Sequence, residues 1–461
     1  MEKLSMMNSD VLVRDIVESY NHAGFINDTE VERKFFLSFL TICFINKVQK
    51  DYYREQVELL FNIVDVDDLK AVLETEFINK LHETLFYEVV NEALALPDLS
   101  PLFRMTDKIS FLLEPEIFEN IGVHELTVIY DQVLQRLQLM NAENRLSKNF
   151  TYQEPPFDFS ELISLLANKT EPHHAYDPFA TTGESSVSYV LNNNNVSITT
   201  ESVLQTSKYI HEKLLIAGAA DIDAKHAFAL SPKANVGKES FDVAYTLFQP
   251  TATEGVREHE ISKRYKKEFI DGRVDSNTIF DKYREHGFIQ HIIWSLKQDG
   301  VGFVVLGKGA LHRQPESEAR NLLLDGNYVD AVIQLPPKLI TSRTVPLNVL
   351  VLKKNRTKNT KIKFIDASSF CKFDGKCNKL IDLKSLADIY HSGSTDTNIY
   401  TEVDVDKIER NSALLTVSSY VSSEVSTYEQ IDADLIRKEL AKQQKLTDYL
   451  LSKLNKKPAV T

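Results

Sequence analysis

The stretch GVGFVVLGKGALHRQPESEARNLLLDGNYVDAVIQLPP, residues 300–337, decides the fold. Its segments GVGFVVLG and YVDAVIQL are short apolar runs rich in Val and Ile, as buried strands are. Between them, the residues around Ser317 to Leu324 have the apolar spacing of a helix. A strand, a crossover helix and a second strand form the unit from which parallel, doubly wound sheets are built.

The same alternation continues on both sides of this stretch. Upstream, we expect strands at HHAYDPFA, VSITTE and FDVAYTLF, separated by helices at ESSVSYVLNN and SVLQTSKYIHEKLLIAGA, with a further helix at 288–297. Downstream, PLNVLVLKKN and KIKFIDAS predict two more strands. The predicted fold class is α/β, with a Rossmann-like, mostly parallel sheet.

The chain divides into four predicted parts. Residues 1–144 show apolar residues at helical spacing and form an all-helical N-terminal domain, whereas residues 145–360 form the Rossmann-like domain. Residues 361–430 are a strand and hairpin extension, and residues 431–461 are an amphipathic helix. That helix either packs on its own domain or offers its apolar stripe to a partner helix.

Composition limits how the chain can contact nucleic acid. Its 461 residues are 43% hydrophobic and carry a net charge of −13, as in a soluble globular protein without a basic surface. Any DNA contact is therefore local or supplied by a partner. The densest basic patch is SKRYKKEF, and it supplies Lys263, Arg264, Lys266 and Lys267 as candidate DNA contacts. A solvated helix surface is the simpler interpretation of this patch.

The cysteines and the N-terminus favour a reduced, cytoplasmic protein without a metal. Cys371 and Cys377 flank a hairpin tip at Asp374-Gly375, and a disulfide or half a metal site is the alternative. No second pair or nearby His completes a zinc set. The N-terminus lacks the pattern of a signal peptide, and the apolar run 35–45 is too short to cross a membrane.

A ligand is expected at the carboxyl ends of the strands, as in other open α/β sheets. The first strand delivers Asp177, which can accept hydrogen bonds from a cationic or amine-bearing ligand, and Gly183 follows in a tight turn before a helix. The next strand ends at Glu201, where an acid could accept from both hydroxyls of a ribose. One glycine and two acids alone are a weak signal for a nucleoside site.

These segments also occur in a familiar order and spacing. DPFATTGE, TTES, the strand ending at Gln249-Pro250, QHIIWSLKQDGVGFVVLGKGALHR and VDAVIQLPPKLITSRTVPLNVLVLKK resemble the adenine-N6 DNA methyltransferases. More narrowly, they resemble the modification (M) subunit of type I restriction–modification systems. The resemblance covers the chain from about Glu125 to its end, with KFIDASS and NSALLTVSSYV downstream.

The resemblance implies a function and partners. It implies S-adenosylmethionine as cofactor, and a reaction in which adenine is flipped out of DNA and methylated at N6. In this family, two M subunits work together with a specificity subunit that reads the DNA sequence. The acidic chain would therefore not have to bind DNA alone. Thr151, Asp177, Gly183 and Glu201 fall at the family's cofactor-binding positions.

The sequence departs from the family within the cofactor motifs. The family turn has a glycine where this chain has Thr181, whose β-branched side chain has little access to positive φ and adds bulk. The family's G-D-x-L motif corresponds to HAFAL, which puts Phe228 in place of the adenine-binding Asp. The family's F-T-P corresponds to Phe150-Thr151-Tyr152, so its proline is absent.

The catalytic tetrapeptide departs as well. The family motif is (N/D)-P-P-(F/Y), whose first side chain and first proline carbonyl accept the two N6 hydrogens while the aromatic ring stacks on the flipped base. This chain has Gln249-Pro250-Thr251-Ala252. Gln249 is one methylene longer than Asn, and the stacking ring and second proline are missing.

Three hypotheses follow. The favoured one is an M-subunit-like protein that works on or with DNA in a modification or antiphage defence complex, with methyl transfer weak or lost. A fully active adenine-N6 methyltransferase with a divergent motif is the alternative. An unrelated Rossmann-like enzyme using another nucleotide has little support, because the sequence has no other phosphate-binding loop.

Overall fold

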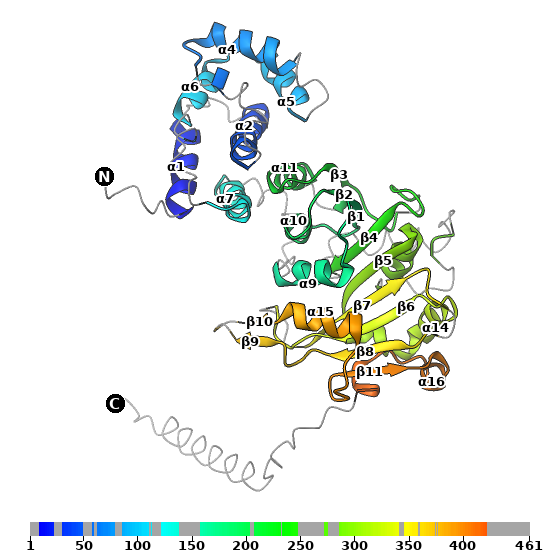
Figure 1. Cartoon of the computed structure of the whole chain (residues 1–461). Helices are drawn as coiled ribbons and strands as arrows, with labels where there is room; N and C mark the ends of the chain where they lie inside the picture. The colour runs from blue at the N-terminus through cyan, green and yellow to red at the C-terminus, as the bar shows by residue number, and fades with distance from the viewer. Residues whose placement is uncertain are drawn as a thin grey trace, which may run out of the picture.

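Figure 1 shows the computed structural model of the chain, with helices at the N-terminal end and a sheet domain after them. The structure describes residues 9–22, 30–48, 58–59, 62–78, 85–109, 112, 121–137, 157–202, 207–231, 233–247, 272–274, 285–340, 345–357, 360–373, 375 and 377–421. The predicted terminal helix at 431–461 lies outside these residues, and the four-part division of the chain stays a prediction.

The described residues up to 137 form helices and the loops between them, as predicted. The helices are α1 (Ser9–His22), α2 (Glu30–Val48), α4 (Val66–Val72), a π-helical turn (Leu73–Ile78), α5 (Leu85–Leu94), α6 (Ser100–Lys108) and α7 (Val123–Arg136). Asp65 caps α4 by accepting from the Asp68 N–H at 2.9 Å. The apolar faces meet in one core, centred on aromatic side chains of α2 such as Phe36 and Phe44.

One sheet in the described part of the chain has nine strands in the order β11-β8-β6-β7-β5-β4-β1-β2-β3. The strands are β1 (His173–Asp177), β2 (Val196–Ser202), β3 (Asp221–His226), β4 (Phe241–Leu247), β5 (Leu296–Gly307), β6 (Val329–Gln334), β7 (Leu347–Lys353), β8 (Ile362–Asp366) and β11 (Tyr400–Val403). β7 runs antiparallel to β5 and β6, and β11 antiparallel to β8. The other pairs are parallel, so the mostly parallel sheet is confirmed.

Helices cover both faces of the sheet (Figure 1). One face carries α9 (Phe157–Ala167), α10 (Glu184–Leu191), α11 (Ser207–Ala217) and α15 (Leu383–Ser392), and the other carries α13 (Glu285–Ser295), α14 (Ser317–Asp325) and α16 (Val405–Arg410). Side chains alternate between the faces along each strand. In β5, Phe303 and Val305 lie in the first core, whereas Val304 and Leu306 lie in the second. Burial on both faces explains the continuous apolar runs.

The edge strand β3 is not predicted by the apolar pattern. Its sequence, DIDAKH, is mostly polar, and its residues are exposed or half-buried. It is held by parallel pairing of Ile222 with Ile198 of β2 and its neighbours. The sheet order reverses at β1 and β4, which places the switch point at the carboxyl end of β1.

A small hairpin follows the sheet. β9 (Cys371–Phe373) pairs antiparallel with β10 (Asn378–Leu380), as the turn at Gly375 predicted. Cys371 and Cys377 of the hairpin are not joined by a disulfide. Within the described ranges, none of the helices combines the length and apolar character needed to cross a membrane.

Candidate cofactor site at the carboxyl ends of β1 and β2

The turn between β1 and α10 is organised by Asp177, the last residue of β1. Its carboxylate accepts the Phe179 N–H at 3.0 Å and the hydroxyls of Ser185 and Ser186 at 2.9 and 3.0 Å. Burial raises the pKa of Asp177 to about 6, although the three hydrogen bonds act in the opposite direction. Asp177 therefore fixes the turn to the first residues of α10.

Gly183 allows the chain to enter α10. Its φ is +87°, which side chains other than glycine rarely tolerate. A Cβ at this position would also meet Ile210 of α11 at 3.0 Å. The turn thus rests directly on α11, and both the backbone angle and the close approach require glycine here.

Thr181, at the family's glycine position, does not have positive φ. The expected conflict between a β-branched residue and a left-handed backbone is therefore wrong for this turn. Thr181 is buried, and its carbonyl accepts from the Ser202 hydroxyl at 3.3 Å. The Ala180 N–H donates to the Glu201 carbonyl at 3.0 Å. These bonds hold the turn against the end of β2.

Glu201 is buried at the end of β2 and is only 1% exposed. Its Oε1 accepts from the Tyr176 hydroxyl at 3.2 Å, and its Oε2 accepts from Asn235 Nδ2 at 3.3 Å. Burial raises the pKa of Glu201, while the two hydrogen bonds lower it. Each carboxylate oxygen thus already has one donor from the protein.

Tyr176 connects Glu201 to α13. Since the one hydroxyl hydrogen goes to Glu201, the 2.8 Å contact with His291 means that Nε2 of His291 donates to the Tyr176 oxygen. Nδ1 of His291 then accepts, and Arg273 Nη1 lies 3.5 Å from it. Burial, with a smaller effect of the Arg273 charge, lowers the pKa of His291 to about 3, so the ring is neutral at pH 7.

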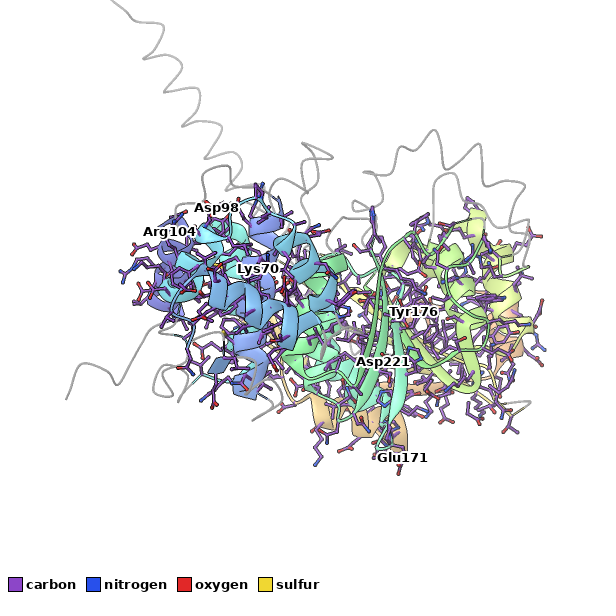
Figure 2. All side chains as sticks on the ribbon, turned by 90° about the horizontal axis from the view of Figure 1, so that it is seen from above. Lys70, Asp98, Arg104, Glu171, Tyr176 and Asp221 are labelled. Atoms are coloured by element: carbon purple, nitrogen blue, oxygen red, sulfur yellow. The ribbon has the colours of Figure 1, made fainter. Side chains whose placement is uncertain are left out.

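The hydrogen-bonded groups lie toward the carboxyl ends of the strands. In Figure 2, Tyr176 lies further along the strands than Glu171, which precedes β1, and Asp221, which begins β3. Phe228 lies just after β3, and its ring packs edge-on against Phe288 of α13 at 6.2 Å. The match of Phe228 to the family's adenine-binding acid stays a prediction, and at this position the structure has an apolar ring packed on α13.

The structure brings together Asp177, Gly183 and Glu201 from the predicted set. The other predicted site residues lie outside the described residues: Thr151, Gln249, Pro250, Lys263, Arg264, Lys266 and Lys267. Sequence reasoning missed Tyr176 and Asn235 as partners of Glu201. The position of Tyr176 next to Asp177 gave a hint, whereas nothing in the sequence marks Asn235.

The sheet, with a glycine turn after β1 and acids at the ends of β1 and β2, defines a doubly wound α/β protein of the kind that binds ligands at the carboxyl ends of its strands. The profile of the N-6 DNA Methylase family matches residues 123–429. The match spans more than half of the chain and the whole sheet, so the protein belongs to the N-6 DNA methylase family.

Two curated relatives are methylase subunits of type I restriction enzymes. The MpnII methylase subunit of Mycoplasma pneumoniae is 36% identical over 152 residues, which are 32% of this chain and 28% of that protein. The HindI methylase subunit of Haemophilus influenzae is 23% identical over 319 residues, 64% of this chain and 68% of that protein. The chain thus aligns with less than a third of the length of the first relative.

The fold matches solved structures over most of the chain. The crystal structure of a type I restriction–modification methyltransferase subunit from Streptococcus thermophilus has a TM-score of 0.57 and 16% sequence identity. The match covers 90% of this chain and 100% of that chain. The resemblance to the M-subunit type of adenine-N6 methyltransferase and the predicted fold class are confirmed.

S-adenosylmethionine is the cofactor of this family. The donors at Glu201 test how its ribose fits: an amide and a phenol already donate to the carboxylate that would accept the ribose hydroxyls. Asn235 donates to the oxygen that would accept a ribose hydroxyl, so Glu201 is chemically suited to accept hydrogen bonds from the ribose of the cofactor. Each carboxylate oxygen can still accept a second hydrogen bond, but the side chain is only 1% exposed, so Asn235 and Tyr176 compete with a ligand for it.

Proposed function

We propose that this chain is an M-subunit-like protein that keeps the adenine-N6 methyltransferase fold and works with DNA in a modification or defence complex. In the proposal, methyl transfer is weak or lost. The observation that carries it is the state of Glu201, whose two oxygens are hydrogen-bonded to Tyr176 and Asn235 and which is buried. A cofactor would have to reach this buried carboxylate and compete with its two donors, which reduces the net binding free energy of the cofactor.

The cofactor would be held by the groups at the ends of β1 and β2. Glu201 would accept from the ribose, the turn at Gly183 would line the cofactor, and Asp177 would keep that turn fixed to α10. S-adenosylmethionine, when bound, supplies the methyl group. The bulk of Thr181 at a position of close approach weakens the fit further.

The sequence of the catalytic tetrapeptide supports the same proposal. Gln249 carries an amide that accepts a hydrogen bond, but its extra methylene displaces that amide by more than a methyl-transfer geometry tolerates. Ala252 stands where a ring would stack on the flipped adenine. Loss of one such stack costs about 1–3 kcal/mol, which weakens base binding without abolishing it. The changes in the catalytic tetrapeptide, together with the changes in the cofactor motifs, disfavour efficient methyl transfer.

Partners account for the acidic character of the chain. We infer that a specificity-type subunit, a second M-like subunit or both supply most of the DNA contacts, because the net charge of −13 opposes binding by this chain alone. In this proposal, the local DNA contacts are Lys263, Arg264, Lys266 and Lys267, and the helix predicted from the sequence at 431–461 is the partner contact. The names of the relatives, methylase subunits of type I restriction enzymes, support this setting.

Calorimetric titration with S-adenosylmethionine, paired with a labelled-methyl transfer assay on mixed duplex DNA, tests the proposal. We expect binding far weaker than micromolar and little or no label on adenine. Micromolar binding with label on adenine would establish the alternative, a fully active methyltransferase with a divergent motif. Addition of a type I specificity subunit distinguishes an inactive site from a missing partner.

A further inference from the structure

Helix α11 belongs to two hydrophobic cores at once. Ile210 and Leu214 lie in the core between the sheet and its helices. Tyr209 and Ile216, on another side of the helix, lie in the core of the N-terminal helices. α11 is therefore shared between the helical part of the chain and the cofactor turn, which rests on Ile210 beneath Gly183.

Two consecutive residues of α7 pair with two consecutive residues of α11. The Tyr130 hydroxyl donates to Glu212 Oε2, and Lys213 Nζ lies 3.0 Å from Asp131 Oδ1. Tyr130 is fully buried, and the Lys213 side chain is only 1% exposed. Such pairs cost desolvation, and breaking one leaves a buried charge unpaired. The relative register of α7 and α11 is therefore strongly specified.

Lys213 also reaches the cofactor turn. Its Nζ lies 3.0 Å from Oε1 of Glu184, the residue that follows Gly183 and begins α10. One buried ammonium thus joins α7, α11 and the N-terminus of α10. The three groups Asp131, Lys213 and Glu184 are called the α7–α10 triad below.

The pKa values of the two acids in the triad shift in opposite directions. Lys213, together with a hydrogen bond to Asp131, holds the pKa of Glu184 at about 2 despite its burial, so Glu184 stays ionised. Burial, with a smaller effect of Glu184, raises the pKa of Asp131. Lys213 and Glu184 therefore form the charged pair, and Asp131 holds the ammonium from the helical side.

We propose that Lys213 is a positioning residue for the cofactor turn, and that it makes the geometry of this turn depend on the docking of α7 through Asp131. The proposal takes the identity of the cofactor end from the proposed function. In physical terms, displacement of α7 removes Asp131 from the ammonium and lets water reach it. The restraint on Glu184 and Gly183 then weakens.

Hydrogen–deuterium exchange of the full chain, without cofactor, tests the restraint directly. In Lys213→Met, the backbone amides at 178–191 should exchange at least about tenfold faster, whereas amides of β5 to β7 should not change. Lys213→Arg keeps the charge and should restore slow exchange at 178–191. Lys34→Met, which breaks the exposed pair with Glu92 inside the helical part, should leave 178–191 unchanged.

Asp131→Ala removes the acceptor on the helical side and serves if Lys213→Met does not fold. It leaves Lys213 and Glu184 in place, so faster exchange at 178–191 without a change in β5 to β7 supports the dependence on α7. Unchanged exchange at 178–191 in a folded Asp131→Ala variant overturns that dependence. Uniformly faster exchange throughout the chain in both variants overturns the proposal in favour of general stabilisation.

Cofactor binding provides the second readout. If the chain binds S-adenosylmethionine, Lys213→Met should weaken binding at least about tenfold and Lys213→Arg by less than about threefold. If Lys213→Met and Lys213→Arg bind S-adenosylmethionine with equal affinity while Lys213→Met shows faster exchange, the positioning of the turn by Lys213 does not affect cofactor binding, and that part of the proposal is wrong. If the natural chain binds no S-adenosylmethionine, the exchange experiment still decides whether Lys213 positions the turn.

Discussion

The hydroxyl of Tyr176 donates to Glu201 at 3.2 Å while it accepts from His291 at 2.8 Å. Glu201, the acid predicted to bind a ribose, is thus the last acceptor in a buried hydrogen-bond network that runs from His291 of α13 through Tyr176 of β1 to β2. Glu201 is a structural acceptor before any ligand arrives. The four predictions that follow concern this network and the turn beside it.

Tyr176→Phe should destabilise the folded chain by about 1–3 kcal/mol, because the substitution leaves the His291 N–H without its acceptor and Glu201 without a buried donor. Urea unfolding followed by circular dichroism measures the change. Tyr328→Phe removes the hydroxyl of a half-buried tyrosine in the same sheet domain and should cost less than about 0.5 kcal/mol. Equal losses in the two variants would mean that the Tyr176 network adds no particular stability.

Asn235→Ala should increase the affinity for S-adenosylmethionine roughly fivefold. Asn235 donates to Glu201 Oε2 at 3.3 Å, and removing a competing hydrogen bond of about 1 kcal/mol gives this factor. Isothermal titration calorimetry measures the change. Asn355→Ala, which removes an exposed bond to Asp299, is the matched control and should have no effect. A lower affinity for S-adenosylmethionine in Asn235→Ala would indicate that Asn235 supports the cofactor site rather than competes with the cofactor for Glu201.

Gly183→Ala should destabilise the chain by about 1–3 kcal/mol. The φ of +87° disfavours any side chain, and the new Cβ would lie 3.0 Å from Ile210. Gly307→Ala is the control, because its Cβ would meet nothing within 4 Å and its φ is −74°. Thermal unfolding should separate the two variants. Similar melting temperatures would show that the turn relaxes without cost.

Mild acid should destabilise the chain through His291. Its pKa is about 3 in the folded chain, whereas an unfolded histidine titrates near about 6.5. Between these values the unfolded chain binds more protons, so the stability present above pH 6.5 is lost as the pH falls toward 3. Asp177 acts in the opposite sense, because its folded pKa of about 6 exceeds the unfolded value of 3.8 and its contribution favours folding at low pH.

His291→Gln isolates the histidine contribution, since glutamine retains an N–H donor but does not titrate. Its urea midpoint should fall less between pH 7 and pH 5 than that of the natural chain, by the equivalent of about 1–2 kcal/mol. Parallel pH profiles for the two chains would rule out His291 as a source of acid sensitivity.

Features governed by local sequence were predictable. Apolar runs in β5 to β7 mark strands buried on both faces, and Gly183 and Glu201 mark the turn and the strand end where a ligand is expected. The register of the sheet then brings Asp177 and Glu201 to one edge without further information.

Features governed by distant contacts were not predictable. β3 has a polar sequence because it is an edge strand, so the apolar pattern does not mark it. His291 lies 115 residues from Tyr176 in the chain, and Lys213 lies 82 residues from Asp131. Such pairs arise from tertiary packing, which a single sequence does not encode in any local pattern. Thr181 is the converse case, since the backbone angle inferred from the family motif does not occur in this turn.

Methyl transfer by the protein purified with its bound subunits tests the central claim most directly. The sample is incubated with mixed duplex DNA and S-adenosylmethionine labelled in its methyl group, and adenine is then separated from the digested DNA. We predict no more label on N6-methyladenine than a Gln249→Ala variant produces under the same conditions. Label on N6-methyladenine well above that variant would contradict the claim that this site has lost efficient methyl transfer.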